Sequence, residues 1–117
     1  MLPVKIYAEF RDADIYTVID TEVVVRPRKG DQFRFGKFDT ELPDNTIEEI
    51  ADAVNESIAA ESYLGRIENK GPVSNYREDV LNFLDFAVWK VTDTIVCCKY
   101  VEVFMELIPG NPDYKRR

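Results

Sequence analysis

The sequence contains no histidine, only five scattered glycines and two cysteines. Without histidine the chain lacks the commonest general base at neutral pH, the usual partner of a catalytic serine or cysteine, and a ligand of most zinc and iron sites. The glycines cannot be assembled into a nucleotide-binding fingerprint. We therefore expect a protein that is not an enzyme, with no catalytic residue, no cofactor and no metal site.

The two cysteines and the distribution of apolar residues both indicate a cytoplasmic protein. Cys97 and Cys98 are adjacent, so in a strand their side chains would point to opposite faces and would not form a disulfide with each other without strain. We expect them to act as small apolar side chains in a reducing compartment and not as a redox or metal-binding pair. No apolar run approaches the length of a membrane span, and the N-terminus lacks the basic and apolar regions of a signal peptide. These features predict a cytoplasmic protein that does not bind membranes.

The chain is long enough for one domain with a hydrophobic core, because 45% of its 117 residues are apolar and 12% are aromatic. We expect residues 1–108 to form a single domain. Residues 109–117 contain two prolines and a basic end, and we expect them to form a flexible C-terminal tail.

Hydrophobic periodicity predicts five strands and two helices. Alternation predicts strands at 4–10, 16–26, 33–38, 89–97 and 101–107. Helical spacing predicts a first helix that begins after a cap at Asn45 or Thr46 and frays near Glu61, and a second helix from 76 to 87. This order predicts an α+β fold: a mainly antiparallel five-stranded sheet, or a partial barrel, with two helices inserted between strands 3 and 4.

The negative charge of the protein is concentrated in one segment. The net charge is −7, from 22 acids and 15 bases, and residues 39–65 hold eight of the acids and no base. Removing those eight leaves 14 acids against 15 bases in the rest of the chain. Residues 26–37, just before this segment, are basic through Arg26, Arg28, Lys29, Arg34 and Lys37. The two segments could face each other and neutralise part of their charge.

The acidic segment has the pattern of an amphipathic helix. Thr46 and Glu49 have the spacing of a capping box at its start. At 100° per residue, one arc of the helix is apolar and comprises Ile47, Ile50, Ala51, Val54 and Ile58. The solvent side carries Glu48, Glu49, Asp52 and Glu56. We hypothesise that these four residues bind a basic partner; the alternative is that they form only the solvated exterior of a helix that covers a sheet.

Asp93 is the most interesting single acid. By alternation it falls on the inward face of the strand that carries Trp89, Val91 and Ile95, where a buried carboxylate would be a candidate functional group. A bend at Thr92-Asp93-Thr94 would instead direct its side chain into solvent, and we favour the bend.

Residues 25–35 contain Pro27-Arg28-Lys29-Gly30-Asp31 between two apolar stretches. This strand–Pro–x–x–Gly–Asp–strand element resembles one found in small β-barrel proteins of bacteriophages and prophages, and the strands at 89–93 and 101–107 resemble those that close such barrels. The resemblance covers the two sheet-forming parts and not residues 39–88. It implies a barrel and a phage or mobile-element origin, with no assigned activity and no site residue.

The leading functional hypothesis is a small non-catalytic protein-interaction module that presents the acidic helix face to a basic partner. The net charge argues against direct binding of nucleic acid. One alternative is an acidic mimic of nucleic acid that inhibits a nuclease or another DNA- or RNA-binding protein. Another is a homo-oligomeric structural phage protein whose copies meet through edge strands and exposed aromatics such as Tyr7, Tyr16 and Tyr100. An enzyme that uses carboxylates alone is the least favoured, because histidine is missing.

Overall fold

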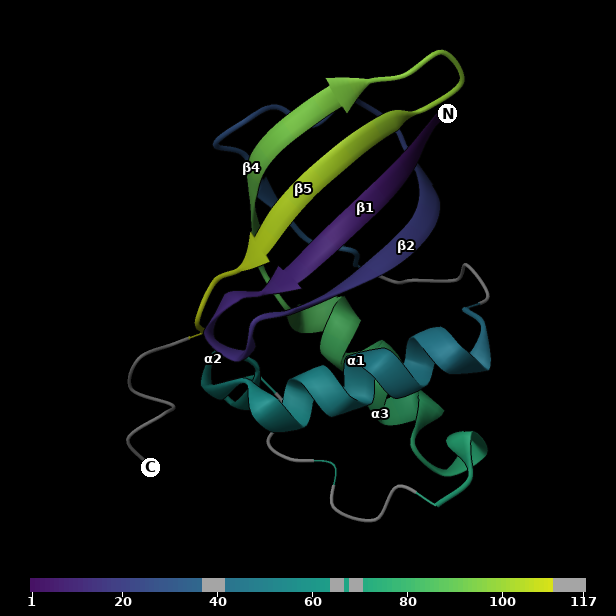
Figure 1. Cartoon of the computed structure of the whole chain (residues 1–117), viewed down its shortest axis with the longest axis vertical. Helices are drawn as coiled ribbons and strands as arrows, with labels where there is room; N and C mark the ends of the chain where they lie inside the picture. The colour runs from purple at the N-terminus through teal and green to yellow at the C-terminus, as the bar shows by residue number, and fades with distance from the viewer. Residues whose placement is uncertain (37–41, 64–66, 68–70, 111–117) are drawn as a thin grey trace.

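The computed structural model describes residues 1–36, 42–63, 67 and 71–110. The strands are β1 (Leu2–Phe10), β2 (Ile15–Val23), β3 (Gln32–Phe33), β4 (Trp89–Val96) and β5 (Val101–Leu107), and the helices are α1 (Asp44–Glu56), α2 (Ile58–Glu61) and α3 (Arg77–Phe86). Short 3₁₀ turns occupy Arg11–Ala13 and Val73–Asn75. The five strands form one sheet in the order β2-β1-β5-β4-β3. Figure 1 shows this sheet curled into a half-barrel, with the helices gathered at one end.

The α+β fold class is confirmed, but the sheet is mixed and not mainly antiparallel. β1 pairs with β2, and β4 pairs with β3 and β5, in antiparallel fashion, whereas β1 and β5 are parallel neighbours with Val4 opposite Val101. Local periodicity identifies the two hairpins but not how they join, because the joining pair is the first and last strand of the chain. The parallel join places the apolar faces of both hairpins on the same side.

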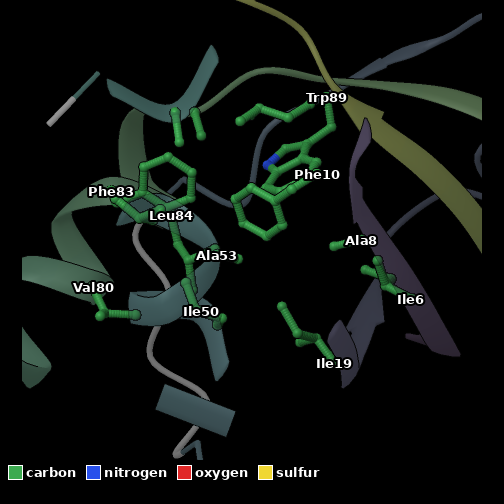
Figure 2. Close-up of a cluster of buried hydrophobic side chains, with 14 of the residues drawn as sticks. Ile6, Ala8, Phe10, Ile19, Ile50, Ala53, Val80, Phe83, Leu84 and Trp89 are labelled. Carbon is green, nitrogen blue, oxygen red and sulfur yellow. The ribbon is translucent and has the colours of Figure 1, made fainter. Parts of the chain in front are cut away.

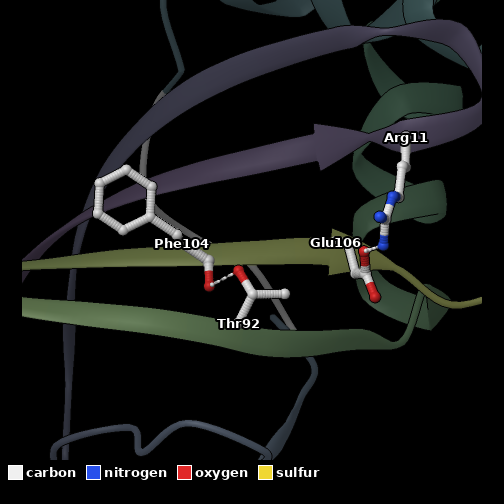
Figure 3. A network of polar contacts seen from close by, with 4 residues as sticks. All are labelled: Arg11, Thr92, Phe104 and Glu106. Atoms are coloured by element: carbon white, nitrogen blue, oxygen red, sulfur yellow. Dashed lines mark hydrogen bonds and ion pairs between the residues drawn. The ribbon is translucent and has the colours of Figure 1, made fainter.

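A β-bulge interrupts β4 at Thr92. The register with β5 shifts between Val91 and Asp93, and the Thr92 hydroxyl donates a hydrogen bond to the Phe104 carbonyl oxygen at 3.1 Å (Figure 3). Asp93 is exposed, and its carboxylate accepts a hydrogen bond from the backbone N–H of Thr94. The prediction of a bend that directs Asp93 into solvent is therefore confirmed.

The bulge also reverses the alternation of the strand beyond it. Ile95 lies opposite Glu102 on the outer face of the sheet and is exposed, so its expected inward position is wrong. Thr94 and Val96 take the positions on the inner side instead. Periodicity does not reveal this change, because Trp89, Val91 and Ile95 still alternate in the sequence although the extra residue of the bulge turns Ile95 to the other face.

Other element bounds also differ from those expected. β2 ends at Val23 and not at Arg26, and the third strand is reduced to two residues, with part of its expected range in 37–41, outside the described residues. The first expected helix is divided, because Ser57 is extended and α2 begins after it. The predicted capping box is wrong: Pro43 is the N-cap of α1, no side chain caps it, and Thr46 is buried.

The break between α1 and α2 is tied to the β1–β2 turn. Asp12 accepts hydrogen bonds from the Ser57 hydroxyl at 2.7 Å and from the Ala59 backbone N–H at 3.0 Å. Burial of the carboxyl raises the pKa of Asp12, but these hydrogen bonds outweigh it and hold the pKa below its usual value. The Ser57 side chain in turn accepts from the backbone N–H of Ala60. A turn residue thus caps a helix far away in sequence.

The core lies between the inner face of the sheet and the helices, and aromatic residues form its centre (Figure 2). Phe10 meets the Trp89 ring edge-to-face with centroids 5.4 Å apart, and Phe83 meets Trp89 in the same way at 6.3 Å. The indole N–H of Trp89 is buried and is the one such side-chain atom without a hydrogen-bond partner among the described residues. An unsatisfied buried donor costs about 1–3 kcal/mol, which the packing of this cluster must offset.

Candidate acidic binding site

Helix α1 has one narrow side open to solvent. Its other sides are buried, against the sheet and against α3, through Thr46, Ile47, Ile50, Ala51, Ala53 and Val54. The four residues predicted to form a binding face, Glu48, Glu49, Asp52 and Glu56, are all exposed on the open side. We call these four residues the acidic stripe. Packing therefore leaves α1 a solvent-facing surface composed mainly of carboxylates.

Lysine and arginine do not neutralise most of this surface within the described part of the chain. There, the ion pairs join Arg11 to Glu106 at 2.9 Å (Figure 3) and Arg77 to Asp44, and none involves Glu48 or Glu56. The Arg77 side chain also donates to the Leu42 carbonyl oxygen, so it anchors the start of α1 and not the acidic stripe.

A groove runs beside the acidic stripe, between α1 and β2. Its volume is about 560 Å³, and it is lined by Tyr16, Val18 and Asp20 from β2 and by Asn45, Thr46 and Glu49 from α1. The Thr17 hydroxyl bridges the two elements by donating to the Glu49 carboxylate at 3.2 Å. One member of the acidic stripe therefore lines the groove as well.

The β2 side of the groove is an edge of the sheet. β2 is the terminal strand of the sheet order, and no strand of the described chain pairs with its outer edge. An edge strand presents backbone donors and acceptors that can pair with another chain. The groove thus combines backbone hydrogen-bonding groups with the carboxylates of Asp20 and Glu49 and the exposed ring of Tyr16. These groups suit an extended, positively charged peptide segment.

The basic segment does not lie against this site in the described residues. Its loop is hydrogen-bonded to the far strand β4, from the Gly30 backbone N–H to the Val91 carbonyl oxygen and from the Val91 N–H to the Asp31 carbonyl oxygen, both at 2.8 Å. No ion pair joins Arg26, Arg28 or Lys29 to α1 across the described ranges. The expectation that the basic and acidic segments neutralise each other is thus not met by these residues.

The outer face of the sheet carries a separate cluster. Tyr7 stacks on Phe104 with ring centroids 4.7 Å apart, and its hydroxyl donates to the Glu102 carboxylate at 2.8 Å. That hydrogen bond raises the pKa of Tyr7 to about 12. The Tyr7 hydroxyl is therefore engaged within the cluster.

The sequence identified the acidic stripe but missed the groove. Tyr16 and Asp20 share a face of β2 by alternation, which periodicity can show, but nothing local indicates that β2 is an edge strand or that α1 lies beside it. In the described residues no cluster of acids or cysteines is arranged to hold a metal ion. None of the helices in that part of the chain is long and apolar enough to cross a membrane.

Comparison with known proteins adds no relative. No family model, curated protein or solved structure matches this chain.

Proposed function

We propose that this chain is a non-catalytic binding protein whose acidic stripe and adjoining groove receive a positively charged segment of a partner protein. One observation carries the proposal: the open side of α1 is acidic where β2, the terminal strand of the described sheet, adjoins it. Strand addition to an edge supplies affinity through the main chain, and neighbouring side chains supply selectivity.

Like charges follow one another along the acidic stripe. Glu48, Asp52 and Glu56 follow one another at a spacing of four residues, and each like-charge pair of this kind costs about 0.2–0.5 kcal/mol. Asp52 and Glu56 lie too far along α1 to gain from its N-terminal dipole. A cationic partner would convert this repulsion into attraction.

The groove adds contacts that a charged surface alone lacks. Tyr16 is exposed at its wall and can pack against an aliphatic or cationic side chain. Asp20 provides a carboxylate from the strand opposite Glu49. A bound basic segment would therefore be held from both walls.

Affinity capture tests the proposal with a stripe-reversed variant that carries Glu48→Lys, Asp52→Lys and Glu56→Lys. The matched control carries Glu9→Lys, Glu78→Lys and Asp79→Lys, which make the same change in net charge at exposed sites outside the acidic stripe and groove. The wild type and the control should capture the same basic protein, the stripe-reversed variant should not, and capture should weaken as salt is raised. All three proteins must give the same circular dichroism spectrum.

Two results would contradict the proposal: capture that survives reversal of the acidic stripe, or capture lost equally in the control. Competition by nucleic acid for the captured protein would identify the partner as a nucleic-acid-binding protein and the acidic stripe as a mimic of its ligand.

A further inference from the structure

The end of the half-barrel away from the helices exposes aliphatic side chains. Val24 and Val25, just after β2, are 81% and 74% exposed, and Val96, at the end of β4, is 61% exposed. Pairing brings them to the same end, because Leu2 lies opposite Val23 while Val4 and Val96 both lie opposite Val101. Exposed apolar groups gathered in this way mark an interaction surface more often than scattered ones do.

Cations border these aliphatic residues. Arg26, Arg28 and Lys29 follow directly in the chain and are exposed, and together with Val25 and Thr94 they line a groove of about 370 Å³. Lys99 is exposed in the turn between β4 and β5. We call this surface the basic end: Val24, Val25, Val96, Arg26, Arg28, Lys29 and Lys99.

The backbone of the basic end is fixed and not loosely attached. Pro27 is buried, and the backbone N–H of Arg28 donates to the Asp31 carboxylate at 2.9 Å. The hydrogen bonds of Gly30 and Asp31 to Val91 hold the loop against β4. A surface that is ordered before binding loses less entropy when a partner docks.

We infer that the basic end of one copy of this chain docks on the acidic stripe of a second copy. The inference rests on the proposed function and names the cationic partner of that site. Charge complementarity carries it: three neighbouring cations at one end of the molecule match a row of carboxylates at the other. Ile58, which is 65% exposed and two residues beyond Glu56, provides an apolar contact for the exposed valines.

Such a contact joins two different surfaces, so it is heterologous. Each copy then keeps one free basic end and one free acidic stripe, and repeated docking produces a ring or an open chain of copies. An anionic membrane is the other surface to which aliphatic and basic residues could bind. A second copy is favoured, because it presents a row of exposed carboxylates that matches the cations of the basic end.

Sedimentation velocity tests the inference by charge exchange. A loop-reversed variant carries Arg26→Glu, Arg28→Glu and Lys29→Glu, and the stripe-reversed variant carries three changes of the opposite sign. We expect the wild type to self-associate at low salt and each variant alone to lose about tenfold or more of that association. An equimolar mixture of the two variants should recover it, since each acidic surface then meets a basic one. The control variant should associate like the wild type.

A wild type that remains monomeric at millimolar concentration and low salt would overturn the inference, as would association that is insensitive to salt or absent from the mixture of variants. Binding of a monomeric wild type, but not of the loop-reversed variant, to vesicles rich in phosphatidylserine would replace the second copy with a membrane. Capture of a different basic protein by a monomeric chain would leave the proposed function intact and remove only its extension to a second copy.

Discussion

The two ends of this molecule place their apolar side chains in opposite environments. At the helix-covered end, Phe10, Phe83 and Trp89 are almost completely buried between the sheet and the helices. At the basic end, valines from the ends of two strands remain in solvent beside cations. The comparison indicates that the helices stabilise one half of the sheet, while the other half, which no described helix covers, keeps a surface available for contacts.

The largest predicted difference between the two ends is in stability. Phe83→Ala should lower the free energy of unfolding by about 3–5 kcal/mol, because it removes a buried ring and leaves a cavity. Val96→Ala should lower it by less than about 0.5 kcal/mol, because its side chain is already in solvent. Urea denaturation followed by circular dichroism measures both, and equal losses would mean that the two ends do not differ in this way.

The link between the β1–β2 turn and α2 should have an intermediate effect. Asp12→Ala should cost about 1–3 kcal/mol, since it leaves the Ser57 hydroxyl and the Ala59 N–H without their acceptor. The pKa of Asp12 is lowered in the folded state, so its contribution is present above the unfolded pKa and is lost as pH falls through that value toward the folded pKa. The difference in free energy of unfolding between wild type and Asp12→Ala should therefore become smaller as the pH is lowered from 7 to 3.

The difference between wild type and Asp12→Ala would not change with pH if Asp12 stabilised the fold only through packing. Asp12→Asn distinguishes the two cases, because it keeps the shape of the side chain and removes the charge. Its stability should resemble that of wild type more closely at pH 3 than at pH 7.

A smaller effect is expected at the end of the acidic stripe. Glu56→Lys should raise the free energy of unfolding by about 0.3–1 kcal/mol, because it removes repulsion with Asp52 and places a cation at the C-terminal end of α1. Partner capture should fall in the same variant. Opposite changes in stability and binding are expected of a surface kept acidic for function, and a loss of stability would argue for a structural role.

The outer face of the sheet gives the smallest expected change in stability and a sharp spectroscopic one. The ultraviolet absorbance titration of wild type should contain a tyrosine transition near pH 12, from the hydrogen bond between Tyr7 and Glu102. Because the pKa of Tyr7 is raised by folding, its stabilising contribution is present below the unfolded pKa and is lost as pH rises toward 12. Tyr7→Phe should remove the transition, and Glu102→Gln should move it to lower pH. A transition unchanged by Glu102→Gln would show that the hydrogen bond is not its cause.

Local chemistry was sufficient to predict the fold class and the acidic stripe. Alternation placed β1 and β5 within a few residues, and the 3.6-residue period of α1 separated its acidic side from its apolar sides. The strands predicted at 89–97 and 101–107 are joined by a turn, in which the Cys97 N–H donates to the Tyr100 carbonyl oxygen. Each of these features depends on residues close together in sequence.

The features that the sequence did not reveal depend on distant residues. The parallel pairing of β1 with β5 joins the first strand to the last, and the groove needs β2 to be an edge strand that lies beside α1. Asp12 caps a helix that begins more than forty residues later, so no local pattern predicts its role. The division of α1 from α2 at Ser57 follows from that same distant contact.

The central claim is that the acidic stripe and the β2 groove bind a basic segment. The most direct test is a map of backbone amide resonances during titration of ¹⁵N-labelled protein with the peptide Val-Val-Arg-Pro-Arg-Lys, which has the sequence of residues 24–29. We predict saturable shifts confined to residues 15–20 and 44–56, weakened by salt, and absent when glutamate replaces the three basic residues of the peptide. Shifts spread evenly over the other acidic surfaces, or equal shifts with the glutamate peptide, would contradict the account.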